Sequence, residues 1–331
     1  MDIQISLIGL GQIGSSFGLA LASYSASITR VGYDRDPDVA NQARKIGAVD
    51  QISSSLAGAI QGSDLVLLAL PMHEIQSAME EITATIEEGA VVLDTAPVKK
   101  SVLGWSESHL PDEVKYVGLT PVVNPEYLDE DQFGIRAARA DLFEGGMIAV
   151  VPGKGVGDDI IKRATNLIGL VGAEPFFVDP EEIDGLMTMT YIMPRLLAAS
   201  LLRATLSKPG WRDGRKIAGR AFARVSGPLT PVDEPASLAS AIMNNKQNVM
   251  RVIDDVIHSL QEFRQQVDEG EGDELLDLLQ QVQQGRNEWW QNRRSSFSES
   301  EAVQASNPAG NIFRQLFGIG RPEPPRGERD P

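Results

Sequence analysis

The stretch that decides the fold is Ile3-Gln4-Ile5-Ser6-Leu7-Ile8-Gly9-Leu10-Gly11-Gln12-Ile13-Gly14. Residues 3–8 have the apolar pattern of a short strand, the G-x-G-x-x-G turn follows directly, and residues 15–22 have a helical pattern. Gly9 permits the tight turn, Gly11 lets the backbone approach a pyrophosphate, and Gly14 lets helix and strand pack closely. We expect this turn, including Gln12 and Ile13, to bind the phosphates of a dinucleotide at the free N–H groups of the helix start.

The second strand supports this interpretation. Residues 28–33 are largely apolar and end at Asp34, twenty residues after Gly14. A carboxylate at this position hydrogen-bonds the adenosine ribose and repels a 2′-phosphate, so NAD is favoured as cofactor. Arg35, next to the acid, keeps NADP possible. A purely structural turn followed by a surface aspartate is the alternative interpretation.

Composition limits the classes of function. The 331 residues suffice for two domains with real cores, and 42% hydrophobic and 23% charged residues are ordinary for a soluble globular protein. A net charge of −16 argues against binding to nucleic acid or to an anionic membrane. The absence of cysteine excludes disulfides and thiolate ligands, and we predict no metal site. No uninterrupted apolar run reaches the ~18 residues of a membrane helix, and no leader precedes the first strand, so we expect a cytoplasmic protein without a membrane partner.

Strand and helix patterns alternate as far as residue 178. Further apolar strand patterns occur at 65–70, 90–94, 116–118, 147–151 and 175–178, and helical patterns at 37–46, 73–86, 98–108 and 158–171. This alternation predicts a Rossmann-type, doubly wound, mostly parallel α/β sheet. We therefore predict an NAD(P)-binding domain over residues 1–178.

Strand signals are scarce after residue 178. Helical patterns cover 181–206, with an interruption at Pro194, then 236–268 and 273–292. Long helices with broad apolar faces often pack against a second subunit. We predict an all-helical substrate and dimerisation domain over 179–294, which forms a homodimer, and a disordered tail over 295–331, where Ser, Pro, Gly and charged residues dominate.

Ligands of an open α/β sheet bind outside the carboxyl ends of its strands. We therefore expect Leu70, Pro71 and Thr95 beside the nicotinamide half of the cofactor, and Thr120 where a substrate would lie. His73 is a candidate acid/base group, or only a polar residue at a helix start.

Positive charge is concentrated between Arg203 and Arg224, where seven basic residues accompany one acid. Guanidinium groups bind carboxylates through paired hydrogen bonds, so this stretch predicts a site for a small anionic carboxylate substrate. A solvated helix face is the alternative.

Several stretches, in order along the chain, resemble the prephenate/arogenate dehydrogenase family of tyrosine biosynthesis. They are residues 9–16, 32–35, 70–75, 94 with 98–100, 141–145, 181–187, 193–198, 211–213 and 244–246, so that the resemblance covers roughly residues 3 to 290. It implies an NAD(P)-binding domain followed by a helical domain that forms a dimer. It also implies oxidative decarboxylation, in which hydride leaves a ring carbinol for nicotinamide and loss of CO2 makes the ring aromatic.

The chain departs from the family pattern within the implied site. The family's catalytic histidine lies in a Gly-x-His-Pro stretch, where this chain has Thr120. Pro97 stands in place of a serine, Ile192 in place of a helical histidine, and Lys216 in place of the substrate arginine, with Arg215 beside it. A threonine can hydrogen-bond a substrate hydroxyl but cannot act as a base near neutral pH.

Our interpretation is an NAD-dependent dehydrogenase of the prephenate/arogenate type. In it Arg212, Arg215 and Lys216 bind the substrate carboxylate and Thr120 orients the reacting hydroxyl. One alternative is a related dehydrogenase for another small carboxylate. The other is a non-catalytic NAD(H)-binding sensor or regulatory dimer whose tail contacts a partner.

Overall fold

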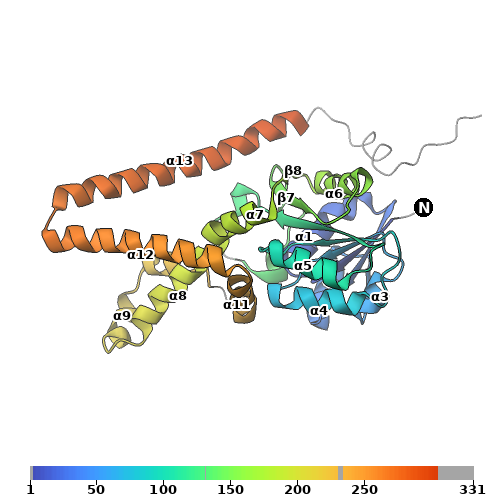
Figure 1. Cartoon of the computed structure of the whole chain (residues 1–331), viewed down its shortest axis with the longest axis horizontal. Coiled ribbons are helices and arrows are strands. Elements are labelled where there is room, and N and C mark those ends of the chain that lie inside the picture. The colour runs from blue at the N-terminus through green and yellow to red at the C-terminus, as the bar shows by residue number, and fades with distance from the viewer. Residues whose placement is uncertain (1–2, 131, 230–233, 305–331) are drawn as a thin grey trace, which may run out of the picture.

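The computed structural model describes residues 3–130, 132–229 and 234–304, with side chains as far as residue 293. Its centre is a sheet with the strand order β3-β2-β1-β4-β5-β6-β7-β8 (Figure 1). The strands are β1 Ile3–Ile8, β2 Ile28–Tyr33, β3 Gln51–Ile52, β4 Leu65–Leu68, β5 Val91–Asp94, β6 Lys115–Pro121, β7 Met147–Pro152 and β8 Glu174–Phe177. Neighbouring strands are parallel except β6 and β7. The predicted mostly parallel, Rossmann-type sheet is confirmed.

Two features of the sheet were not predicted. β3 has only two residues, too few for a periodic pattern, and pairs with β2 through Val31 and Gln51. The antiparallel pairing of β6 with β7 follows from their connection, which holds the short turns η2 Pro125–Tyr127 and η3 Gly134–Ala137. A return to the parallel direction needs a crossover, usually a helix, and the described part of this connection has none.

Helices cover both faces of the sheet. One face packs against α1 Gln12–Leu21, α2 Pro37–Lys45 and α6 Asp158–Leu170, and a short turn, η1 Ala22–Tyr24, follows α1. The other face packs against α3 Leu56–Ile60, α4 Met72–Ile82 and α5 Lys100–His109. Successive strand residues divide between the two cores: Leu67 belongs to the first and Val66 and Leu68 to the second. A strand buried on both faces explains the continuous apolar runs of the sequence.

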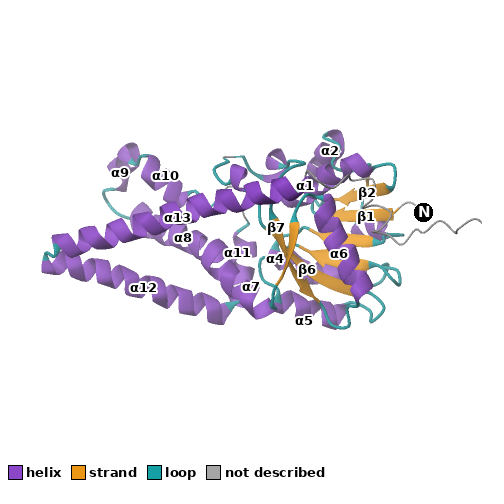
Figure 2. Cartoon of the chain, turned by 90° about the horizontal axis from the view of Figure 1, so that it is seen from above, coloured by secondary structure: helices purple, strands orange, loops and turns teal. Residues whose placement is uncertain are grey.

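The predicted helical domain follows the sheet. Its elements are α7 Pro180–Met187, the π-helical turn η4 Thr188–Ile192, α8 Met193–Leu206, α9 Trp211–Ile217, α10 Arg220–Ser226, α11 Pro235–Asn244, α12 Lys246–Glu269 and α13 Gly272–Gln304. Ile192, Ala241 and Val249 extend the second core of the sheet into this domain. α12 runs away from the sheet and α13 returns toward it (Figures 1 and 2). On α13, Arg293 is the last residue whose side chain is described, and it donates a hydrogen bond of 3.1 Å to the carbonyl of Val123.

Three helix boundaries differ from expectation. Pro194 does not interrupt the run 181–206, because the π-helical turn η4 directly before α8 accommodates the missing N–H. The run 236–268 is instead two helices that meet at Asn245. α13 continues to residue 304, so residues 295–304 are helical rather than disordered. The rest of the predicted tail, 305–331, lies outside the described residues, and the domain limits stay a prediction.

One helical run is long and apolar enough to cross a membrane, judged by length and composition alone. Over residues Pro180–Leu206 the mean hydropathy of an 18-residue window reaches 1.3, and 22% of that window is buried. This corrects the expectation of no such segment, which considered only uninterrupted apolar runs. A helix whose apolar side faces another subunit has the same composition.

Candidate active site

The glycine turn joins β1 to α1, which begins inside the motif at Gln12. Gly9 has a φ of +89°, and a Cβ there would lie 2.4 Å from the carbonyl oxygen of Ala69. A Cβ on Gly14 would lie 2.0 Å from the carbonyl oxygen of Gly9. A Cβ on Gly11 would meet no described atom within 4 Å, so this position opens in front of the helix N-terminus. The turn therefore fits a pyrophosphate.

Asp34 follows β2 beside this turn. Its carboxylate accepts hydrogen bonds from the N–H groups of Leu10, at 2.7 Å, and Asp36, at 2.9 Å. A neighbouring cavity of about 280 Å³ is lined by Tyr33, Asp34, Arg35, Pro37, Asn41 and Ser53, among others. Since this cavity lies at the end of the second strand, the adenosine half of a dinucleotide fits it.

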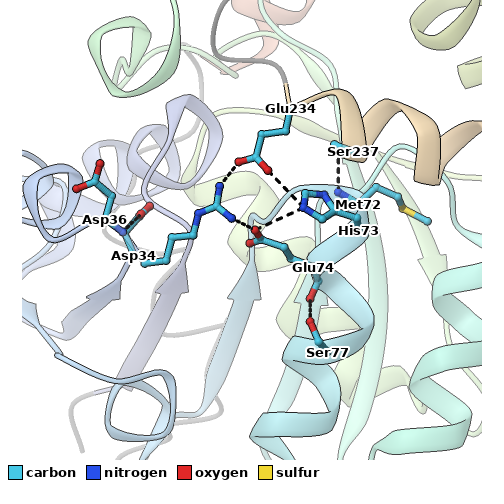
Figure 3. Close-up of polar contacts among 9 residues, drawn as sticks. Asp34, Asp36, Met72, His73, Glu74, Ser77, Glu234 and Ser237 are labelled. Atoms are coloured by element: carbon cyan, nitrogen blue, oxygen red, sulfur yellow. Dashed lines mark hydrogen bonds and ion pairs between the residues drawn. The ribbon is translucent and has the colours of Figure 1, made fainter.

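Arg35, a predicted cofactor residue, pairs with two carboxylates, which Figure 3 labels as Glu74 and Glu234. Its guanidinium forms ion pairs with Glu74 of α4 and with Glu234, which directly precedes α11 in the helical domain. Glu74, followed by Glu234, raises the pKa of Arg35. Neither pair follows from a local sequence pattern, because Glu74 is 39 positions and Glu234 is 199 positions from Arg35.

His73 lies in the same cluster. Its Nε2 is 3.3 Å from Oε2 of Glu234 and 3.7 Å from Oε1 of Glu74. Potential ligand atoms of these three side chains lie within 4.8 Å of one another, a spacing that a metal ion could use. Because Arg35 already pairs with both carboxylates, we assign no metal to the cluster, and the prediction of no metal site stays a prediction.

The predicted nicotinamide neighbours lie at the ends of adjacent parallel strands. Leu70 and Pro71 follow β4, and Thr95 follows β5, where its backbone N–H donates a hydrogen bond of 3.1 Å to the carbonyl of Leu68. Pro71 also lines a cavity of about 590 Å³, whose other walls include Tyr191, Arg195, Glu234, Ser237 and Leu238 of the helical domain. The two domains thus meet around a space large enough for a small substrate.

Among the described residues that line this cavity, Arg195 carries a positive charge, and it was not among the predicted site residues. Its guanidinium carbon lies 3.8 Å above the ring centre of Tyr191, and its Nη1 donates a 3.0 Å hydrogen bond to the carbonyl of that residue. Stacking and hydrogen bonding hold the guanidinium in place while leaving it planar and charged, which suits a carboxylate ligand.

Thr120 lies near the carboxyl end of β6, paired in register with Ala149 of β7. Its side chain is 2% exposed. Its Oγ1 has no hydrogen-bond partner among the described residues. Buried polar atoms are almost always hydrogen-bonded, so this hydroxyl near the carboxyl end of β6 keeps an unused hydrogen-bonding capacity among the described residues.

The predicted substrate cations are not brought to this edge within one subunit. Arg212, Arg215 and Lys216 are exposed on α9, and Nζ of Lys216 lies 2.8 Å from Oδ1 of Asp213. α9 lies at the far side of the helical domain from the sheet in both views (Figures 1 and 2).

A buried charge network includes Asp94, the last residue of β5, which directly precedes Thr95. Nζ of Lys99 is 3.0 Å and 2.8 Å from the two carboxylate oxygens of Asp94, both side chains are fully buried, and the hydroxyl of Tyr116 donates to the same carboxylate. Burial lowers the pKa of Lys99, and burial together with Asp94 raises the pKa of Tyr116 well above its ordinary value. Asp184 of α7 accepts the N–H groups of Lys99, at 2.5 Å, and of the next residue, at 3.2 Å. The network therefore links the end of β5 to the helical domain.

Comparisons with known proteins agree with this arrangement. The prephenate dehydrogenase nucleotide-binding domain matches residues 17–176, and the prephenate dehydrogenase dimerization domain matches residues 179–281. The chain is 24% identical over 289 residues to the prephenate dehydrogenase of Bacillus subtilis, which covers 83% of this chain and 73% of that protein. It is 23% identical over 296 residues to the cyclohexadienyl dehydrogenase of Zymomonas mobilis, covering 86% and 94%.

A solved structure has the same fold. The prephenate dehydrogenase from A. aeolicus, in complex with hydroxyphenyl propionate and NAD+, superimposes with a TM-score of 0.75 at 22% identity, covering 87% of this chain and 98% of that chain. Both domains of one family thus match in order over most of the sequence. The chain belongs to the prephenate dehydrogenase family and is a dehydrogenase of that type.

Proposed function

We propose that the protein uses NAD to oxidise and decarboxylate prephenate or arogenate, in the cytoplasm and as a homodimer. The observation that carries the proposal is the buried hydroxyl of Thr120, which lacks a partner among the described residues at the edge where ligands bind. The relatives named for prephenate and for cyclohexadienyl substrates support this substrate class.

The proposed cofactor site uses the residues that fit a dinucleotide. Gly9, Gly11, Gln12, Ile13 and Gly14 hold the pyrophosphate and Asp34 the adenosine ribose. Leu70, Pro71 and Thr95 surround the nicotinamide half. NAD, when bound, supplies the acceptor for the hydride. The NAD+ named with the A. aeolicus protein supports NAD over NADP.

Thr120 is proposed to hydrogen-bond the reacting hydroxyl and to orient it, in the place of the family's histidine. A threonine does not take up a proton near neutral pH, so the hydroxyl proton leaves to water. General acid–base help is worth typically 10²–10⁴-fold in rate. We therefore expect turnover that is slow rather than absent.

The substrate carboxylate is proposed to bind cations of the helical domain. Arg195 lines the cavity within the same subunit. Arg212, Arg215 and Lys216 would reach the cavity from the partner subunit, because α9 lies away from its own sheet (Figure 1). The match to a dimerization domain supports such an arrangement.

The test is production of reduced nicotinamide by purified protein, supplied with prephenate or arogenate and with NAD or NADP, with NADH binding measured in the same sample. Turnover that falls in Arg195→Met, mainly through a higher KM, is the expected result. NADH binding without turnover would contradict the proposed substrate. A panel of other hydroxy acids would then distinguish a dehydrogenase for another carboxylate from a non-catalytic dimer.

A further inference from the structure

The two carboxylates that hold Arg35 suggest how the protein chooses between NAD and NADP. These cofactors differ only at the 2′ position of the adenosine ribose. Asp34 and Arg35 both line the cavity proposed for that ribose. An arginine at this position can accommodate a 2′-phosphate, provided that its guanidinium is available.

The guanidinium of Arg35 already has partners. It forms ion pairs with Glu74 of the nucleotide-binding domain and Glu234 of the helical domain, and Asp34 is a third carboxylate nearby (Figure 3). One positive charge therefore faces three negative ones. A 2′-phosphate would have to displace both glutamates from Arg35 and would still face their negative charge.

We infer that Glu74 and Glu234 are selectivity residues, which exclude NADP by keeping Arg35 in ion pairs. This inference rests on the proposed use of a dinucleotide cofactor, and adds two determinants to Asp34. Glu234 belongs to the helical domain, so the preference for NAD also depends on how that domain sits on the nucleotide-binding domain.

The expected effect is moderate, because the side chain of Arg35 is 59% exposed and those of Glu74 and Glu234 are 22% and 33% exposed. Exposed ion pairs each contribute little free energy. Removing the charge of one glutamate should therefore lower the ratio of the NADPH to the NADH dissociation constant about two- to fivefold. Removing the charges of both glutamates should lower this ratio about tenfold.

The experiment measures NADH and NADPH binding to the full chain by nicotinamide fluorescence, for Glu74→Gln, Glu234→Gln and the double variant. Each substitution keeps the size of the side chain and removes its charge. Glu81→Gln, an exposed position on the same helix, is the matched control and should leave the ratio unchanged. Adding Arg35→Leu to the double variant should abolish the gain, because the gain comes from the freed guanidinium.

Three outcomes decide the inference. A lowered ratio that depends on Arg35 supports it. An unchanged ratio in the double variant overturns it, as does a gain that survives Arg35→Leu. If one single variant fails to fold, the ratio is measured in the other single variant with and without Arg35→Leu, and the same results support or overturn the inference. Wild-type protein that binds neither nucleotide would refute the proposed function itself, whereas NADH binding with an unchanged ratio refutes only this inference.

Discussion

Thr120→Val separates the two roles that a buried hydroxyl can have. Valine has nearly the same shape, and Oγ1 of Thr120 has no hydrogen-bond partner among the described residues. A buried polar group without a partner costs about 1–3 kcal/mol. We therefore expect the free energy of unfolding to rise by about 1 kcal/mol or more. If the hydroxyl binds substrate, loss of that neutral hydrogen bond should lower kcat/KM about two- to tenfold.

The assays are urea unfolding at one fixed protein concentration and steady-state kinetics. Thr188→Val is the matched control, because Thr188 is fully buried and its Oγ1 donates to the carbonyl of Asp184, at 2.8 Å, and accepts from Asn245, at 2.7 Å. This variant should lose about 1–3 kcal/mol of stability. Equal destabilisation by Thr120→Val and Thr188→Val would contradict an unpartnered hydroxyl at Thr120. An unchanged kcat/KM in Thr120→Val would contradict its contact with the substrate.

Three further predictions concern stability and assembly. Asp94→Asn leaves the buried ammonium of Lys99 without its carboxylate, so the free energy of unfolding should fall by about 3–5 kcal/mol in chemical denaturation. Burial alone would raise the pKa of Asp50, but hydrogen bonds from Arg30 bring this pKa below its ordinary value of 3.8. The stability that this shift adds is present above pH 3.8 and is lost as the pH falls through the lower folded-state pKa. In Asp50→Asn, the free energy of unfolding should therefore fall less steeply as the pH is lowered through this range. Leu260→Asp places charge on an exposed apolar position of α12 and should give monomers in light scattering.

Controls exist for two of these changes. Glu181→Gln removes the carboxylate partner of Lys100, but both side chains are more than half exposed, so stability should stay nearly constant. Equal losses for Glu181→Gln and Asp94→Asn would contradict the importance of burial. Gln265→Asp adds the same charge to α12 at an exposed polar position and should leave the proposed dimer intact. For Asp50, an unchanged acid slope in the variant would contradict the assigned pKa.

The nucleotide-binding half could be predicted because its requirements are local. Gly9 and Gly14 lie where any side chain would collide with neighbouring backbone, and Asp34 ends the strand that the apolar pattern marks. Alternation of strands and helices then fixes which edge of the sheet is free for ligands.

The features of the candidate site that could not be predicted depend on contacts between residues far apart in the sequence. Arg35 and Glu234 are 199 positions apart, and no periodic pattern of the sequence predicts such an ion pair. The break between α11 and α12 has the same origin, because Asn245 leaves helical geometry while its side chain binds Asp184 and Thr188 of another helical run. The basic stretch between Arg203 and Arg224 indicates a concentration of positive charge, but not where this charge lies in the fold. Its helix α9 lies away from the sheet of its own subunit (Figure 2).

The return of α13 has a consequence for how the chain is made. Arg293 reaches Val123 across 170 residues, directly beyond the strand that holds Thr120. The sheet can fold while the ribosome is still translating the helical domain, because domains generally form as units from the N-terminal side. The contact with Val123 must wait until α13 has left the exit tunnel. Because the entropy of loop closure grows only slowly with loop length, this contact forms late in folding at little extra entropic cost.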